Sequence, residues 1–212
     1  MKNIDKLQNL LPLGYLFLII LGITRDSIFY YQLGINIIRY SSIMDILISP
    51  IAAVTSHPVF FITILALFVF FFKLPKILLQ NEDKKWLHNL FGSKNTDFFS
   101  NNNSNQSEES IEVVKINYYN TISIEFLSVF LIAIFLGYGL ADGRHISDQI
   151  KNNKLSYNYR LNYSDDKSEN VYIVGSNTAY YFYTTKGSSS IKIVPVNSIR
   201  NLEMIKNRML DK

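Results

Sequence analysis

The sequence offers few residues that could perform chemistry, and their spacing gives them no common site. The three histidines, His57, His88 and His145, are far apart, and no pair has the i, i+4 spacing of zinc ligands on a helix. Cysteine is absent, which excludes disulfides, thiolate metal ligands and thiol nucleophiles. There is no glycine-rich phosphate loop and no Gly-x-Ser-x-Gly turn. We therefore expect no catalytic residue, no metal ligand and no cofactor, and a non-enzymatic protein is favoured.

Two carboxylates stand out because apolar residues surround them. Asp45 lies in an apolar stripe, and Glu125 lies one turn after the start of a hydrophobic run. An acid in such a setting is costly unless it is paired, and acids within membrane spans often mark functional sites. Asp45 is expected to be structural if Arg25 or Arg39 pairs with it, and functional if it faces a cavity. Glu125 has two interpretations, a position among the lipid head groups or a buried acid facing other helices.

An aromatic run is the candidate interaction surface. It consists of Tyr180, Tyr181, Phe182 and Tyr183. The simplest interpretation is a strand that is buried on one side and covered by phenol rings on the other. The functional interpretation is a binding platform for a ligand or a nucleic acid. Nucleic acid is not expected as a partner, because no nucleic-acid-binding motif supports it.

The elements that carry these residues are predicted to be membrane helices. Charged residues make up 18% of the chain, whereas soluble domains average roughly a quarter. The apolar residues gather in three runs, which we expect to span the membrane at about 7–24, 54–73 and 122–141. Each run approaches the roughly 20 residues that a helix needs to cross a bilayer. The lipid bilayer is thus the first expected partner.

The segments between the spans are expected to lie at the membrane surface. Residues 27–53 are too apolar for an aqueous loop and too polar for a span, which favours short interfacial helices over a re-entrant hairpin. Residues 74–121 are expected to hold an amphipathic helix with Trp86 and then a Ser/Asn-rich linker. Residues 1–141 would together form the membrane domain.

Two runs within the first connector carry a resemblance. Gly34-Ile-Asn-Ile-Ile-Arg-Tyr40 and Ser42-Ile-Met-Asp-Ile-Leu-Ile-Ser-Pro50 resemble a motif of small uncharacterised bacterial integral-membrane proteins. Those proteins place the motif after a first span, and some end in a short β segment rich in Tyr and Phe. The resemblance implies this architecture, and it implies no activity.

The C-terminal residues 142–212 are expected to form a linker and a small all-β module. Residues 155–163 alternate strictly between apolar and polar side chains, as in a half-buried strand. Three further strand-like runs follow, at 171–174, 179–185 and 191–194. Asn197 is predicted to cap a closing helix with Ile199, Leu202 and Ile205 along one side. About four strands and a helix suggest a partly open SH3-like or Sm-like barrel.

The predicted fold class is therefore an α-helical membrane protein of about three transmembrane helices with a small C-terminal β module. From Asp142 onward the chain has 11 Lys and Arg against 7 Asp and Glu, so its formal net charge of +4 lies in the tail. Lys and Arg beside the spans number seven on the side of the N-terminus and five on the other. This excess favours a cytoplasmic N-terminus, with the β module outside a bacterial inner membrane.

Two functions of different classes fit these features. The first is a non-enzymatic, membrane-anchored interaction protein that presents its basic β module at the membrane surface. Its partner would be a second copy or another membrane or periplasmic protein. The alternative is an oligomeric channel or membrane-permeabilising effector, in which Asp45 and Glu125 line a pathway. Three spans cannot enclose a pore alone, so this alternative requires several copies.

Overall fold

The structure is a computed structural model that describes residues 2–56, 58–81, 84 and 108–205. These residues form two compact units, one made of residues 1–53 and 134–212 and the other of residues 54–133. The helical segments that come before the strands in the described residues are α1 (Lys2–Tyr31), the 3₁₀ turn η1 (Ile37–Arg39), α2 (Ile43–Ser56), α3 (Pro58–Gln80) and α6 (Glu108–Lys151). The strands are β1 (Tyr159–Tyr163), β2 (Ser168–Ser176), β3 (Tyr180–Thr185), β4 (Lys192–Pro195) and β5 (Ile199–Met204), with the 3₁₀ turn η2 (Val196–Ser198) before the last.

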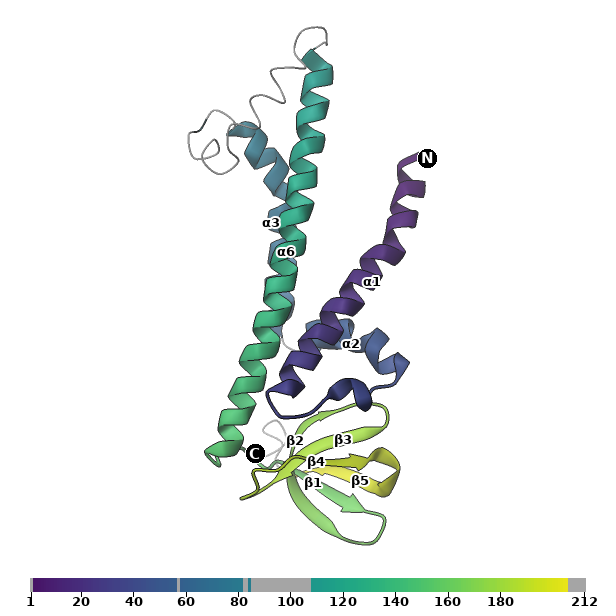
Figure 1. Ribbon diagram of the computed structural model, residues 1–212, viewed down its shortest axis with the longest axis vertical. Helices are drawn as coiled ribbons and strands as arrows, with labels where there is room; N and C mark the ends of the chain where they lie inside the picture. The colour runs from purple at the N-terminus through teal and green to yellow at the C-terminus, as the bar shows by residue number, and fades with distance from the viewer. Residues whose placement is uncertain (1, 57, 82–83, 85–107, 206–212) are drawn as a thin grey trace. The chain divides into compact units, whose positions relative to one another are not determined.

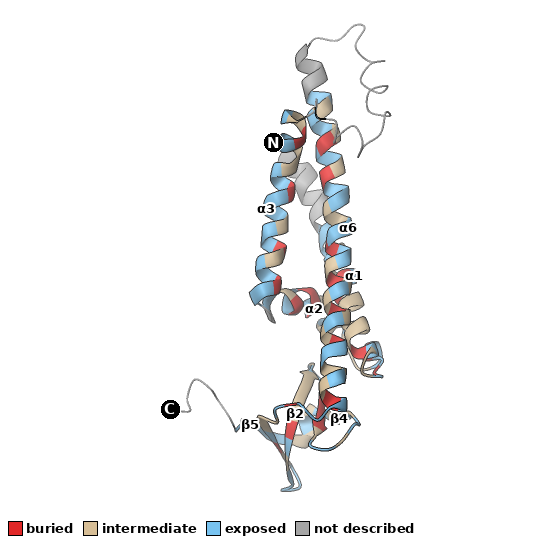
Figure 2. Ribbon diagram, turned by 90° about the vertical axis from the view of Figure 1, so that its left-hand side faces the viewer, coloured by how far each residue is buried: buried red, intermediate tan, exposed pale blue. Residues whose placement is uncertain are grey.

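Three helices in the described part of the chain are long and apolar enough to cross a membrane. They contain the segments Pro12–Tyr31, Pro58–Gln80 and Val113–Lys151. The predicted class of about three transmembrane helices is thus confirmed, although the helices extend beyond the predicted boundaries. Exposed positions dominate α3 and α6 in Figure 2, as expected of helices whose apolar surface faces lipid. The 44 residues of α6 are about twice the number that a bilayer requires.

The unit of residues 54–133 consists of α3 and the first part of α6. The rings of Phe71 and Phe130 lie 5.6 Å apart, and Leu78 is buried with Tyr119. These contacts ascend α3 while they descend α6, so the two helices are antiparallel here. Residues 74–80, which were predicted to begin an amphipathic helix, continue α3 instead. The rest of that predicted helix, with Trp86, and most of the Ser/Asn-rich linker lie outside the described residues.

In the other unit, α1 and the end of α6 run parallel and approach closely. A Cβ atom added to Gly139 would lie 2.6 Å from the carbonyl oxygen of Arg25, and one added to Gly143 would lie 2.7 Å from that of Phe29. Gly22 in turn makes room for α2, because its Cβ would lie 2.7 Å from the backbone nitrogen of Pro50. Small residues of this kind let membrane helices pack backbone against backbone.

The β module is a five-stranded antiparallel sheet with the order β4-β3-β2-β1-β5. Neighbouring strands are joined by turns, except that β5 crosses back to pair with β1. The predicted strands are confirmed at 159–163, 168–176, 180–185 and 192–195, while 155–158 stay outside the sheet. This order places β4 and β5 at the two edges of the sheet, with a 3₁₀ turn before the last strand.

The predicted closing helix from Asn197 is wrong, because residues 199–204 form β5. Leu202 pairs with Leu161, and Met204 pairs with Tyr159. These two apolar residues of β5 are two positions apart, which is the spacing of residues on one face of a strand. A helical period of three fits Ile199, Leu202 and Ile205 equally well from sequence alone. The strand is favoured over the helix because β1 would otherwise have an unpaired edge. As a strand, β5 provides hydrogen-bond partners for the backbone groups of β1.

Both faces of the sheet are buried at β3. Leu161, Val171 and Tyr183 form the core on one face. Phe182 points to the other face and packs against residues of α1 and the first connector, beside which the sheet lies in Figure 1. Phe182 is completely buried, and Tyr183 is 3% exposed. The sequence predicts that the strand with the aromatic run is buried on one side only, whereas β3 is buried on both sides.

Replacing Gly139 should separate α1 from α6. We expect Gly139→Leu to destabilise the protein by about 1–3 kcal/mol, because an oversized side chain at a close contact forces backbone shifts. The matched control is Gly14→Leu, since a Cβ at Gly14 has no atom within 4 Å. Thermal unfolding of the purified protein in detergent, followed by circular dichroism, checks the difference. Equal melting temperatures of the two variants would contradict this packing.

Candidate functional site

The candidate site is the junction at which the first connector holds the β module, and Gly34 shapes its start. Gly34 has a φ of +75°, which favours glycine, and the amide of Ile35 donates back to the carbonyl of Tyr30. The chain thereby leaves α1 in a tight turn. Ile35 and Ile37 are buried as a result, at 9% and 7% exposure. The side chain of the next residue, Ile38, faces solvent and is 54% exposed.

Aromatic rings fill the apolar centre of this junction. The ring of Tyr30 lies 5.2 Å from that of Phe182, and the ring of Tyr40 lies 5.5 Å from Tyr180 and 5.9 Å from Phe182. A β-bulge between Ile173 and Gly175 interrupts the pairing of β2 with β3. The Tyr30 hydroxyl occupies the place where a Cβ of Gly175 would be, so glycine is required there.

The turn between β2 and β3 supplies polar contacts at the rim of the junction. The side-chain amide of Asn177 donates to the carbonyl of Tyr40 at 3.0 Å. Its side-chain oxygen accepts from the backbone amides of Ala179 and Tyr180 at 3.0 and 2.8 Å. Asn177 therefore orders its own turn and ties it to the connector at the same time.

Asp45 completes the rim and links two distant segments of the chain. Its carboxylate accepts from the amide and hydroxyl of Ser42, both at 2.7 Å, while its own amide donates to the Ser42 hydroxyl at 3.1 Å. This reciprocal pattern is a capping box at the start of α2. The same carboxylate accepts from the amide and the hydroxyl of Thr178, each at 3.0 Å. The partners of Asp45 are thus Ser42 and Thr178, and not the arginines considered from the sequence.

The electrostatics of Asp45 follow from these donors. Partial burial raises the pKa of the Asp45 carboxyl, but the hydrogen bonds from Ser42 and Thr178 outweigh it, so the pKa lies below its ordinary value of 3.8. Asp45 is accordingly a carboxylate at neutral pH. Its chemistry is that of a fixed acceptor for backbone and hydroxyl donors.

The aromatic run itself is mostly engaged inside the chain. Phe182 and Tyr183 are buried, Tyr180 packs against Tyr40, and Tyr181 is partly exposed. On the inner face, the hydroxyls of Tyr163 and Tyr183 lie 2.6 Å apart, and Tyr163 also donates to Glu169. Burial and these hydrogen bonds raise the pKa of Tyr163, so its hydroxyl stays protonated at neutral pH.

Glu125 lies elsewhere, on the part of α6 that belongs to the unit of residues 54–133. It is exposed, so the structure does not bury it against other helices of the same chain. The structure therefore brings Asp45 together with the aromatic run through Thr178 and Tyr40, whereas Glu125 belongs to the other unit.

A separate cluster of polar side chains lies where α1, α2 and α6 meet. Arg25 contacts Asp26 at 2.9 Å and Asp142 at 3.4 Å, and Ser49 donates to Asp26. The guanidinium also lies 5.9 Å from the centre of the Phe29 ring. Paired charges of this kind can stay between helices, because each meets an opposite charge or a hydrogen-bond donor.

Some residues of these sites escaped the sequence analysis although signals for them exist. Gly139 and Gly143 have the G-x-x-x-G spacing of close membrane-helix contacts. Asn177 and Thr178 lie between two predicted strands, where their types favour a turn. Nothing in the sequence indicates that this turn meets Asp45, because 133 positions separate the two partners.

Neither metal chemistry nor known proteins add to this description. Among the described residues there is no group of three or more His, Cys, Asp or Glu side chains that could hold a metal ion. No protein-family model matches the chain, and no curated protein or solved structure is significantly similar to it.

The Asp45 contact should make the junction sensitive to acid. Because the pKa of Asp45 is depressed in the folded protein, the stabilisation is complete above its ordinary value of 3.8 and is lost as pH falls through the lower folded value. Asp45→Asn should weaken the junction by roughly 1–2 kcal/mol, since one Thr178 donor then meets an amide instead of a carboxylate. Hydrogen exchange of the segment around Thr178, corrected for intrinsic rates, measures both effects.

The control for this experiment is Asp148→Asn, which alters an exposed acid on α6. It should leave the exchange of the segment unchanged at every pH. Exchange in Asp45→Asn that matches the wild type and keeps the same dependence on pH would contradict the assigned role.

Proposed function

We propose that the chain is a non-enzymatic, membrane-anchored interaction protein that presents a small basic β module at the membrane surface. The observation that carries the proposal is a module fixed to the end of a membrane helix on one face while an edge strand remains exposed. A module held in this way can offer a partner a binding surface at a constant height and orientation.

Strand β5 is the surface that we propose for the partner. It pairs with β1 on one side only and ends the sheet. Leu202 is 37% exposed and Met204 is 53% exposed, and no second described strand pairs with β5. Apolar side chains thus accompany the backbone groups of this edge. Exposed edges of this kind bind extended segments by adding a strand to the sheet. The proposed partner is therefore a protein, either a second copy or another membrane or periplasmic protein.

The proposed location is a bacterial inner membrane, crossed several times. The three long apolar helices support membrane association. The contacts of the module with Tyr30 and Tyr40 support a position beside the C-terminal end of α1. Combined with the excess of Lys and Arg around the N-terminal side of the spans, this favours a cytoplasmic N-terminus and a module on the outer side.

The oligomeric channel stays a prediction, and no contact among the residues that the structure describes favours it. Asp45 engages its carboxylate with Ser42 and Thr178. Glu125 is exposed. To line a pathway, it would have to face residues of another copy of the chain.

Site-specific photo-cross-linking in intact membranes tests the proposal. A benzophenone amino acid placed at Leu202 or Met204 should form a discrete adduct with a protein, because both side chains lie on the proposed surface. The same group at Lys186, on the exposed turn after β3, is the matched control and should give little adduct. Mass spectrometry of the adduct then separates a second copy from a different protein. The absence of adducts at both β5 positions, or equal adducts at all three, would contradict the proposal.

A further inference from the structure

A groove of about 510 Å³ lies between the C-terminal part of α1 and α6. Ile28 and Tyr31 line it on α1, and Leu136, Gly137 and Leu140 line it on α6. All of these residues belong to segments that are long and apolar enough to cross a membrane. The groove has the volume of a small-molecule site, and its surface is mainly hydrocarbon.

Gly137 creates the hollow in this groove. A Cβ added to Gly137 would meet no atom within 4 Å, whereas those added to Gly139 and Gly143 would collide with α1. The latter two glycines therefore serve the contact between the helices. A side chain at Gly137 would enter open space beside α1.

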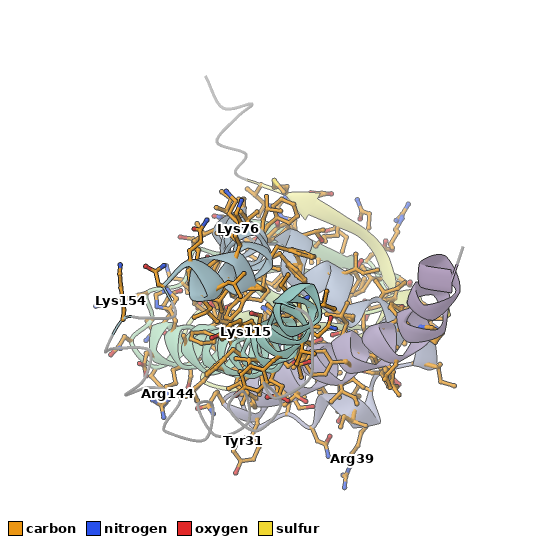
Figure 3. All side chains as sticks on the ribbon, turned by 90° about the horizontal axis from the view of Figure 1, so that it is seen from above. Tyr31, Arg39, Lys76, Lys115, Arg144 and Lys154 are labelled. Atoms are coloured by element: carbon orange, nitrogen blue, oxygen red, sulfur yellow. The ribbon has the colours of Figure 1, made fainter. Side chains whose placement is uncertain are left out.

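Gln32 lines the end of the groove nearest the β module, and a cation of α6, Arg144, follows just beyond the lining residues. Gly143 lies against the side chain of Gln32, which also lines the groove, so Arg144 is at the level of this end. Arg144 follows Leu140 by one helical turn and so lies on the groove side of α6. Its side chain is exposed, and it pairs with no acid of the described residues. Figure 3 shows Tyr31 and Arg144 projecting from the same side of the protein.

We propose that this groove binds one acyl chain of a phospholipid with an anionic head group, whose phosphate lies at Arg144. The apolar part of the groove extends from Leu140 toward Leu136, into the hydrophobic stretch of α6, as an acyl chain requires. The cation stands at the other end, where a head group would be. Ser27 also lines the groove, and its buried hydroxyl has no hydrogen-bond partner among the described residues.

The anionic head group is chosen on charge. Arg144 is an exposed cation of α6, and a lipid with a net negative head group complements its charge. This proposal concerns the helices and does not depend on the protein partner proposed for β5.

Native mass spectrometry tests the lipid site. The full-length protein is reconstituted into bilayers of equal phosphatidylglycerol and phosphatidylcholine, extracted in mild detergent and weighed with its retained lipids. We expect the wild type to retain one phosphatidylglycerol. Gly137→Leu should lower this retention about tenfold by filling the groove. Arg144→Gln should lower the preference for phosphatidylglycerol about fivefold, which corresponds to roughly 1 kcal/mol per cation at an anionic surface.

Two controls separate the groove from general effects. Gly14→Leu enlarges a glycine of α1 outside the groove, and Lys154→Gln removes an exposed cation away from it; both should retain lipid as the wild type does. If Gly137→Leu melts below the wild type, Leu136→Trp is the second variant that fills the groove. Retention of both lipids equally by the wild type, undiminished retention in the filled variants, or a lipid-free dimer would overturn the proposal.

Discussion

The burial of Phe182 is the interaction on which the rest of the molecule depends. This side chain lies on β3, next to the edge strand β4 of the five-stranded sheet, and has no accessible surface. The other buried residues of its cluster come from the opposite end of the sequence. They are Tyr30, Ile35 and Ile37. A sheet of about 50 residues buries too little apolar surface to be secure alone. The first connector therefore completes the core of the module.

The same dependence explains the polar contacts around this core. Water must be kept from the aromatic centre, and the donors and acceptors at its rim must be satisfied. Asn177 and Thr178 present the turn of the sheet to the connector, and Asp45 and the carbonyl of Tyr40 receive it. Ser42 positions the Asp45 carboxylate for this contact. The residues that cap α2 are therefore also the residues that attach the module. An acid that stands out in an apolar sequence thus has a place in the fold without an opposite charge beside it.

The sequence predicts the elements better than their contacts. Hydrophobic runs and strict alternation locate the three long helices and the strands, since both patterns report burial on a known period. The hydrophobic period does not distinguish a helix from a strand at Ile199, Leu202 and Ile205. The strand forms because it pairs with the free edge of β1. The meeting of Asp45 with Thr178 could not be predicted, because nothing local links a helix cap to a turn 133 residues later. The contact of Gly139 and Gly143 with α1 could have been predicted from their spacing.

The central claim is that the connector holds the β module in one position, and a distance measurement tests it most directly. The chain has no cysteine, so two introduced cysteines at Arg39 and Lys186, both exposed, can carry spin labels without interference. One label then reports on the connector and the other on the sheet. Pulsed electron paramagnetic resonance in bilayers should give a single narrow distance distribution that broadens in Asp45→Asn. A broad distribution in the wild type, as for a tethered module, would contradict the claim.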